Sequence, residues 1–117
     1  MGEILVGIKG KDEAVVTIAK IGTGLTDEQF RELYAKLHKL EIQNTKLENY
    51  EVSDSLIPDV WVKPEVVVEI AADEITISPS HSAKYAIRFP RLVKFRDDKS
   101  VKEITTQGEI EAMYGQQ

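Results

Sequence analysis

The sequence has no cysteine, and its 117 residues include no apolar run near the roughly 18 to 20 residues that a membrane-spanning helix requires. Without thiols the chain can form neither a disulfide framework nor a zinc site of the cysteine type, which favours a reducing intracellular compartment. The first residues also lack the basic start and apolar stretch of a signal peptide. We therefore expect one soluble domain without a membrane partner, located in the cytoplasm, or in the nucleus if the organism is eukaryotic.

Histidine and aromatic residues are also scarce. The two histidines, His38 and His81, lie far apart and outside any carboxylate cluster with metal-ligand spacing, so we expect structural or surface roles for them and no metal site. Aromatic residues make up 7% of the chain and fall mostly at core spacing. A stacking surface for single-stranded nucleic acid therefore has little material, and "PDVWVKP" around Trp61 more readily predicts a packed strand edge than a base-stacking site.

Positive charge is concentrated in one part of an acidic chain. The net charge of -5 would by itself disfavour binding to phosphates. Residues 84–102, however, hold seven basic and two acidic residues, a net charge of +5, whereas the remaining residues hold eight basic and eighteen acidic ones, a net charge of -10. The segment 84–102 is therefore the expected anion-binding part of the chain, with an ordinary solvated strand end as the alternative.

Local patterns predict short strands and two helices. In "EILVGIKGKDEAVVTIAKIG" two apolar runs rich in β-branched residues flank a polar turn at 10–12, which predicts a hairpin. "TDEQFRELYAKLHKL" has apolar residues at helical spacing after the capping pair Thr26 and Gln29, which predicts a helix. A polar connector is expected at 43–55, strands at 66–70, 75–77 and 85–95, and a terminal helix after the capping pair Thr106 and Glu109.

Five or six short strands, one helix in the middle and one at the end are typical of a small OB-fold β-barrel, in which the internal helix closes one barrel end. We therefore expect an all-β fold with accessory helices. The chain shows no internal repeat and no low-complexity segment, so 1–117 is expected to be one domain. The glycine pair at 22–24 precedes the helix, and we expect it to form the turn into the Thr26 cap rather than a phosphate cradle.

"RFPRLVKFRDDK", residues 88–99, lies within the basic segment. Pro90 cannot donate a ladder hydrogen bond and marks an edge or a bulge, which leaves open whether Phe89 lies in the core, as simple alternation places it, or points outward. Arginine can bind two phosphate oxygens at once with its planar fork, lysine offers a compact charge, and Asp98 can hold a neighbouring cation in place. Beyond Pro90, alternation predicts a core face of Val93 and Phe95 and an outer face of Leu92, Lys94 and Arg96.

This segment resembles the last nucleotidyltransferase motif of the ATP-dependent DNA ligases, which runs Arg-Phe-Pro-Arg, an apolar pair, a basic residue, an apolar residue and Arg-x-Asp-Lys. Three further stretches are similar to ligase sequences in the same order: "KIGTGLTDEQF" to the start of the ligase OB-fold domain, "IPDVWVKPEVVVEIAADEITISPSH" to its middle and "ITTQGEIEAMY" to its terminal helix. The spellings "VWVKP" and "ADEITISPSH" are closer to archaeal ligases than to eukaryotic or viral ones. Lys94 stands where many relatives carry arginine, which keeps the charge.

The resemblance implies that 1–117 is the C-terminal OB-fold domain of a larger ATP-dependent DNA ligase. Such enzymes seal nicks in duplex DNA through enzyme-adenylate and DNA-adenylate intermediates, in replication, repair and recombination. The family's adenylated lysine lies in a Lys-x-Asp-Gly motif, which this sequence lacks. We therefore expect ATP and Mg²⁺ to be used by the full-length enzyme, and the isolated domain to be inactive with no cofactor bound. The implied partners are nicked duplex DNA and the adenylation domain of the same chain, with a sliding clamp as a further candidate.

The resemblance also implies roles for individual residues. Arg96 and Lys99 match the cations that such ligases present to the β- and γ-phosphates of ATP during self-adenylation, and with Asp98 beside them they form the expected catalytic set. Arg88 and Phe89 match a pair that in relatives meets the catalytic domain and the minor groove near the nick, and they form the expected DNA-binding set. The expected phosphate-binding set comprises Arg91, Lys94, Arg96 and Lys99.

Two alternative functions stay open at this point. One is a free-standing OB-fold module for single-stranded nucleic acid, which would bind an oligonucleotide in a strongly salt-dependent manner. The other is the corresponding domain of a messenger-RNA capping guanylyltransferase, a related fold in which an upstream domain chooses the nucleotide.

Overall fold

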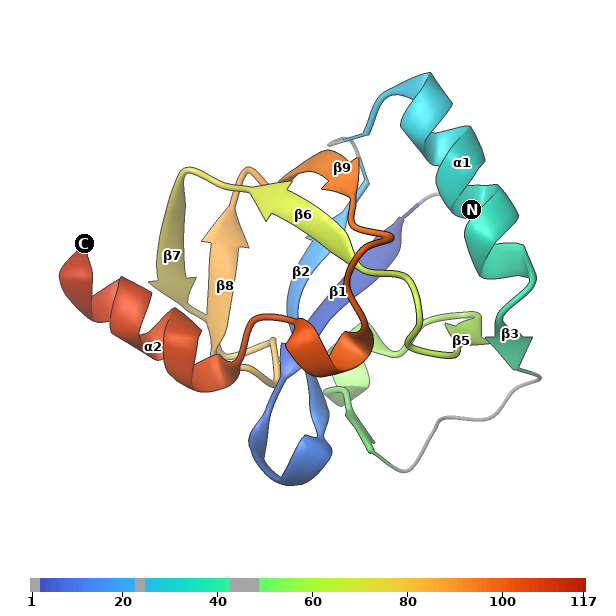
Figure 1. The fold of residues 1–117 in the computed structure, drawn as a ribbon. Helices are drawn as coiled ribbons and strands as arrows, with labels where there is room; N and C mark the ends of the chain where they lie inside the picture. The colour runs from blue at the N-terminus through green and yellow to red at the C-terminus, as the bar shows by residue number, and fades with distance from the viewer. Residues whose placement is uncertain (1–2, 23–24, 43–48) are drawn as a thin grey trace.

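Short strands form the centre of the fold, and the α-helices α1 and α2 lie on opposite sides of them (Figure 1). The computed structural model describes residues 3–22, 25–42 and 49–117. No helix in these ranges is long and apolar enough to cross a membrane. The strands are β1 (Ile4–Lys9), β2 (Val15–Ile21), β3 (Glu41–Ile42), β4 (Tyr50–Glu51), β5 (Trp61–Val62), β6 (Val68–Ala71), β7 (Glu74–Ile77), β8 (Tyr85–Arg88) and β9 (Arg91–Phe95). The α-helices are α1 (Asp27–His38) and α2 (Gln107–Gln116), and short 3-10 helices lie at Lys11–Glu13, Asp54–Leu56 and Val101–Glu103.

The β1–β2 hairpin predicted from the sequence forms the centre of the fold. β1 pairs antiparallel with β2 from Ile4 opposite Ile21 to Lys9 opposite Val15. Residues 16–19 of β2 are all buried, and because successive side chains of a strand point to opposite faces, both faces of β2 are covered. The buried core cluster consists of Ile8, Val16, Ile18, Ala19, Ile21, Ala83 and Ile110.

Three antiparallel ladders, β3–β5, β6–β9 and β7–β8, surround this hairpin, and β4 extends it by pairing in parallel with β2. The arrangement is the predicted OB-fold with accessory helices. Two local predictions need correction. The strand expected at 85–95 is interrupted at 89–90 and forms β8 and β9, and the connector expected at 43–55 contains β4. Residues 23–24 of the predicted glycine turn and residues 43–48 of the connector lie outside the described residues.

Helix α1 begins at the predicted capping box and is fixed against β9. The Thr26 hydroxyl accepts the Gln29 backbone N–H at 3.1 Å, and the Gln29 side-chain oxygen accepts the Thr26 backbone N–H at 3.0 Å. Gln29 Nε2 also donates to the Leu92 carbonyl of β9 at 3.1 Å. On the next turns Leu33 is buried, and the Lys36 ammonium lies over the ring of Phe95. The helix therefore supports the strand that carries the basic segment.

Helix α2 begins at the second predicted capping box. Thr106 and Glu109 exchange backbone-to-side-chain hydrogen bonds of 3.0 and 3.1 Å. Ile110 belongs to the core, and the ring of Tyr114 lies 5.2 Å from that of Tyr85 on β8. These contacts hold α2 beside β7 and β8, as Figure 1 shows.

Candidate anion-binding site on strand β9

A bulge in β9 changes the predicted alternation. The pairing with β6 skips Val93: Lys94 lies opposite Glu69, and Leu92 lies opposite the next β6 residue. Leu92 is 6% exposed and belongs to the core, whereas Val93 is 48% exposed. The predicted outer position of Leu92 and core position of Val93 are therefore wrong. A bulge inserts one extra residue into a strand. The alternation that fits exposed Lys94 and half-buried Phe95 therefore does not continue to Leu92 and Val93.

Arg96 follows β9 and is held by two carboxylates. Its Nε and Nη2 groups each donate to Asp98 at 3.0 Å, and its Nη1 group donates to Glu69 of β6 at 3.0 Å. The Arg96 backbone N–H donates to the Val67 carbonyl at 2.8 Å, and the Lys99 backbone N–H donates to the Arg96 carbonyl at 3.1 Å. The Arg96 side chain is 25% exposed. The three residues predicted to be catalytic thus lie in one turn at the end of β9.

The contacts within this turn favour the charged forms of Arg96 and Asp98. Hydrogen bonds from Arg96 lower the pKa of the Asp98 carboxyl from 3.8 to about 2, and the charges of Arg96 and Lys99 act in the same direction. Hydrogen bonding to Asp98 raises the pKa of the Arg96 guanidinium, and Glu69 adds to this effect. Both side chains therefore stay ionised across the physiological pH range.

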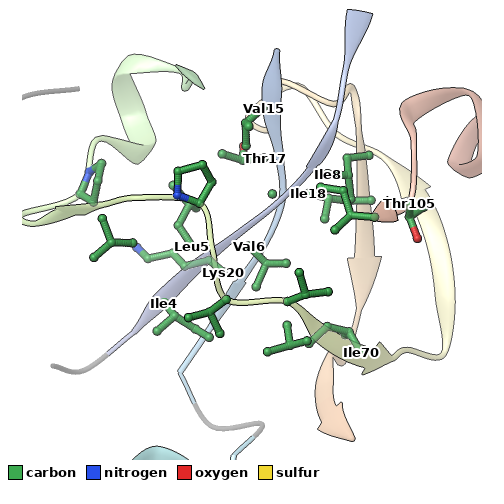
Figure 2. A pocket seen from close by; sticks show the side chains of 18 of the residues that line it. Ile4, Leu5, Val6, Ile8, Val15, Thr17, Ile18, Lys20, Ile70 and Thr105 are labelled. Carbon is green, nitrogen blue, oxygen red and sulfur yellow. The ribbon is translucent and has the colours of Figure 1, made fainter. Parts of the chain in front are cut away.

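Arg96 and Lys99 also line a cavity of about 1240 Å³ among the strands. Figure 2 shows part of its lining, to which Ile4, Leu5 and Val6 of β1 and Ile70 of β6 contribute. The lining in this view comes mostly from apolar strand residues. The two cationic residues therefore border an apolar hollow rather than a closed polar pocket.

The other arginines of the basic segment are paired as well. Arg88 Nη1 donates to Glu74 at 2.8 Å, and Arg91 Nη1 donates to Asp73 at 3.0 Å. Glu74 begins β7 and Asp73 immediately precedes it, so these acids belong to a different part of the sequence from the arginines. The net charge of +5 that the segment carries in the sequence is consequently partly neutralised in the fold.

Phe89 points outward between β8 and β9, which answers the question that the sequence left open. Its backbone φ is 52°, in the left-handed region, and the residue is 63% exposed. The guanidinium carbon of Arg88 lies 5.2 Å from the centre of the Phe89 ring, and Arg91 Nη1 donates to the Phe89 carbonyl at 2.8 Å. Core packing of Phe89, the alternative from simple alternation, is wrong because this positive φ breaks the alternation of β8.

The predicted residues fall into two groups at the two ends of β9. The DNA-binding pair precedes the strand, and the catalytic set follows it. Arg91, predicted to bind phosphate, begins β9 beside the DNA-binding pair, and its backbone lies ~16 Å from that of Arg96, given the rise of a strand. Lys94 lies between the two groups. Neither Lys94 nor Lys99 forms an ion pair with a carboxylate of the described residues.

Three acidic partners of the arginines lie outside the basic segment and are not apparent from its sequence. They precede the arginines by 14 to 27 residues, so no local pattern connects them. Antiparallel pairing of the strands predicted at 75–77 and 85–95 is the signal that could have found one of them, because it places acids of one strand opposite cations of the other. The partners are Glu69, Asp73 and Glu74.

His81 and Trp61 make structural contacts, and His38 lies on the surface. His81 Nδ1 lies 3.0 Å from the hydroxyl of buried Thr17, and burial lowers the pKa of the His81 ring. Trp61 is half-buried, with its ring stacked 5.9 Å from that of Tyr50. His38 is exposed on α1. Within the described ranges, no three histidine or acidic side chains gather in a way that could hold a metal ion.

The chain is similar to DNA ligases along most of its length. The family model of the ATP-dependent DNA ligase C-terminal region matches residues 1–99. The DNA ligases of Saccharolobus solfataricus (strain P2) and Saccharolobus islandicus (strain L.S.2.15) are each 40% identical over 116 residues, which cover 92% of this chain and 19% of the relative. The chain thus spans about a fifth of the length of the curated relatives that it matches.

Solved ligase structures have the same fold. The ligase domain of M. tuberculosis LigD matches 89% of this chain with a TM-score of 0.66 at 24% identity, and 32% of that domain is covered. A mycobacterial DNA ligase D complexed with ATP and MES matches the same shares at the same identity with a TM-score of 0.64. With the OB-fold confirmed and the sequence match extending over most of the chain, the protein belongs to the family of ATP-dependent DNA ligase C-terminal regions, of the archaeal type.

Proposed function

We propose that the chain acts as the C-terminal OB-fold domain of an enzyme that seals nicks in duplex DNA with ATP, and that the turn after β9 orients the β- and γ-phosphates of ATP during self-adenylation. The observation that carries this proposal is the clustering of Arg96, Asp98 and Lys99 in one turn, at positions that match the ligase motif. The Lys99 ammonium is not engaged by a carboxylate of the described residues, so it can meet an incoming phosphate.

Self-adenylation transfers AMP to a lysine and releases pyrophosphate. In the proposed complex, that lysine lies in the adenylation domain of the same enzyme, which also binds ATP with its Mg²⁺. The OB-fold domain then closes over this site. Negative charge grows on the leaving pyrophosphate, and cations held in fixed positions stabilise it without reorganising. Lys99 supplies a compact charge, and Arg96 supplies the N–H groups that its carboxylate partners leave unused. Asp98 acts as a positioning residue because it fixes the plane of the guanidinium.

The test is the rate of enzyme-adenylate formation in the full-length ligase. Loss of a charge-assisted hydrogen bond costs about 1.5 to 3 kcal/mol, so Arg96→Ala and Lys99→Ala should each slow this step by roughly 10- to 100-fold. Lys102→Ala is the matched control, because Lys102 is an exposed lysine of the same segment outside the turn. Equal slowing in all three variants would mean that the total positive charge of the segment, and not the turn after β9, determines the rate of enzyme-adenylate formation.

We further propose that Arg88 and Phe89 contact the minor groove near the nick. An exposed aromatic ring beside a guanidinium is suited to this role, since apolar wedges inserted from the minor groove widen and bend the duplex. Phe89→Ala in the full-length ligase should slow sealing of nicked DNA and leave self-adenylation unchanged. A slower self-adenylation with normal sealing would contradict this assignment. A sliding clamp stays a candidate partner of the full-length enzyme.

Catalytic inactivity of the isolated 117-residue chain follows from the same proposal. The chain has no Lys-x-Asp-Gly motif, so it has no lysine in the sequence context that the family adenylates. Incubation with radiolabelled ATP should leave the chain unlabelled, and nicked DNA should stay unsealed. Stable labelling of the chain would show that the adenylated residue lies within it.

A further inference from the structure

Arg96 has little free hydrogen-bonding capacity in the structure. A guanidinium carries five N–H donors, and three of those of Arg96 are used: two by Asp98 and one by Glu69. Two N–H donors are therefore left for a phosphate. The guanidinium and its two carboxylate partners together carry a net charge of -1, which the neighbouring Lys99 only balances. The turn consequently offers a polyphosphate no net positive charge unless one carboxylate moves away.

Glu69 is the carboxylate more easily displaced. Asp98 lies two residues from Arg96 in the same turn and accepts two hydrogen bonds, each of 3.0 Å. Glu69 lies on another strand, accepts one bond of 3.0 Å and has a side chain that is 41% exposed. Asp98 is the more exposed of the two, at 66%, but displacing it would break two hydrogen bonds of a bidentate pair, whereas displacing Glu69 breaks one.

A second cation is available to Glu69 when it leaves Arg96. The register of β6 and β9 places Lys94 directly opposite Glu69. Residues directly opposite each other in an antiparallel pair point to the same face with Cβ atoms about 4.5 to 5.5 Å apart, which is within reach of a Lys–Glu ion pair. Lys94 is exposed and forms no ion pair with a carboxylate in the described part of the chain.

We propose that Glu69 is a positioning residue that competes with polyphosphate for Arg96: it binds Nη1 in the free domain and exchanges to Lys94 when a phosphate oxygen takes its place. Glu69 thereby holds the guanidinium ready in its plane and weakens the binding of anions that cannot displace it. The inference rests on the proposed function in one respect, since it takes the phosphates of ATP as the ligand of Arg96 in the full-length enzyme.

The first test uses the 117-residue chain and inorganic tripolyphosphate, followed by ¹H–¹⁵N NMR of the arginine Nε–H groups. Glu69→Gln keeps an oxygen for Nη1 and removes the charge. An anion of about four charges, ~6 Å from the lost charge in a water-like dielectric and screened at 0.1 M salt, should bind roughly 10-fold more tightly to this variant. Glu74→Gln removes the same charge from the Arg88 ion pair and is the matched control, with an expected change below about twofold.

A double variant tests whether Glu69 acts through Arg96. In the Arg96→Ala background, Glu69→Gln should change tripolyphosphate affinity no more than Glu74→Gln does, because without Arg96 nothing holds the anion close to residue 69. A role of Glu69 that does not depend on Arg96, whether structural or electrostatic, would leave the gain intact. Unchanged or weaker binding by Glu69→Gln, a gain that persists without Arg96, or no measurable binding by folded wild-type and Glu69→Gln chains would each overturn the inference.

The full-length ligase separates this inference from the proposed function. Glu69→Gln should lower the KM for ATP in self-adenylation by about 3-fold, given the smaller charge of Mg²⁺-bound ATP, with little change in kcat. If Arg96→Ala slows self-adenylation but Glu69→Gln leaves KM unchanged, the role of Arg96 stands and the competition by Glu69 is wrong. If Arg96→Ala has no effect, the proposed function itself fails, and with it the extension of this inference to ATP.

Discussion

Replacing Phe89 by glycine and by alanine should give two variants of different stability, with the glycine variant the more stable. Phe89 has a φ of 52°, a left-handed conformation in which any residue with a Cβ atom is strained. Both replacements remove the ring and its contact with the Arg88 guanidinium at 5.2 Å, so these losses cancel in the comparison. The difference between the variants therefore reports the backbone alone.

The magnitude follows from two opposing effects. A residue other than glycine in the left-handed region costs about 1 to 3 kcal/mol, whereas the greater freedom of glycine in the unfolded chain costs about 0.5 to 1 kcal/mol. We expect the glycine variant to exceed the alanine variant by about 1 kcal/mol in the free energy of unfolding, or about 4 °C in Tm for a chain of this size. The residue is 63% exposed, so little buried surface changes in either case.

Urea unfolding followed by the fluorescence of Trp61, the one tryptophan of the chain, measures this difference. Ala35→Gly on α1 is the control with the opposite sign, because glycine within an exposed helix position lowers stability by about 1 kcal/mol. In the full-length ligase both Phe89 variants should seal nicks equally slowly. An alanine variant as stable as the glycine variant would show that Phe89 is not held at positive φ and would remove the explanation for its outward position.

Three further predictions concern the stability of the 117-residue chain. Burial lowers the pKa of His81, so below pH ~6.5 the unfolded state binds a proton that the folded state does not bind. The free energy of unfolding, measured with urea, should therefore fall from pH 7.5 to pH 5.5, and it should fall less in His81→Asn. Leu33→Ala should lose about 2 to 5 kcal/mol in the same assay, because Leu33 is 2% exposed; a loss below 1 kcal/mol would mean that α1 is not packed on the core. Thr106→Ala should lose about 1 kcal/mol and lower the helical circular dichroism through loss of the α2 capping box, whereas unchanged stability would show that the cap contributes nothing.

The features that the sequence predicted correctly depend on residues close together in the chain. The two capping boxes each join residues three positions apart, and both helices begin where these pairs lie. The β1–β2 hairpin likewise joins neighbouring apolar runs across a short turn. The strands β3, β4 and β5 have two residues each, too few for any alternation to be recognised, and their pairing comes only from the tertiary fold.

The features that the sequence did not reveal depend on contacts between distant segments. The bulge at Val93 is a feature of the pairing between β9 and β6 and has no local signal in the sequence. Simple alternation therefore predicted an outer position for Leu92, which is wrong. Positive charge was overestimated for the same reason, because the partner of Arg96 on β6 lies 27 residues earlier and that of Arg88 on β7 lies 14 residues earlier. The ligase motif identified which residues to examine, but only the fold shows that its arginines are already engaged.

The most direct test of the central claim is the sealing of a pre-adenylated nick by the full-length Arg96→Ala ligase. This substrate needs no ATP, so the cations after β9 have no β- or γ-phosphates to orient. We predict a sealing rate within about threefold of wild type, alongside the roughly 10- to 100-fold loss expected for self-adenylation. Normal self-adenylation with a collapse of sealing would contradict the assignment of Arg96 to the phosphates of ATP.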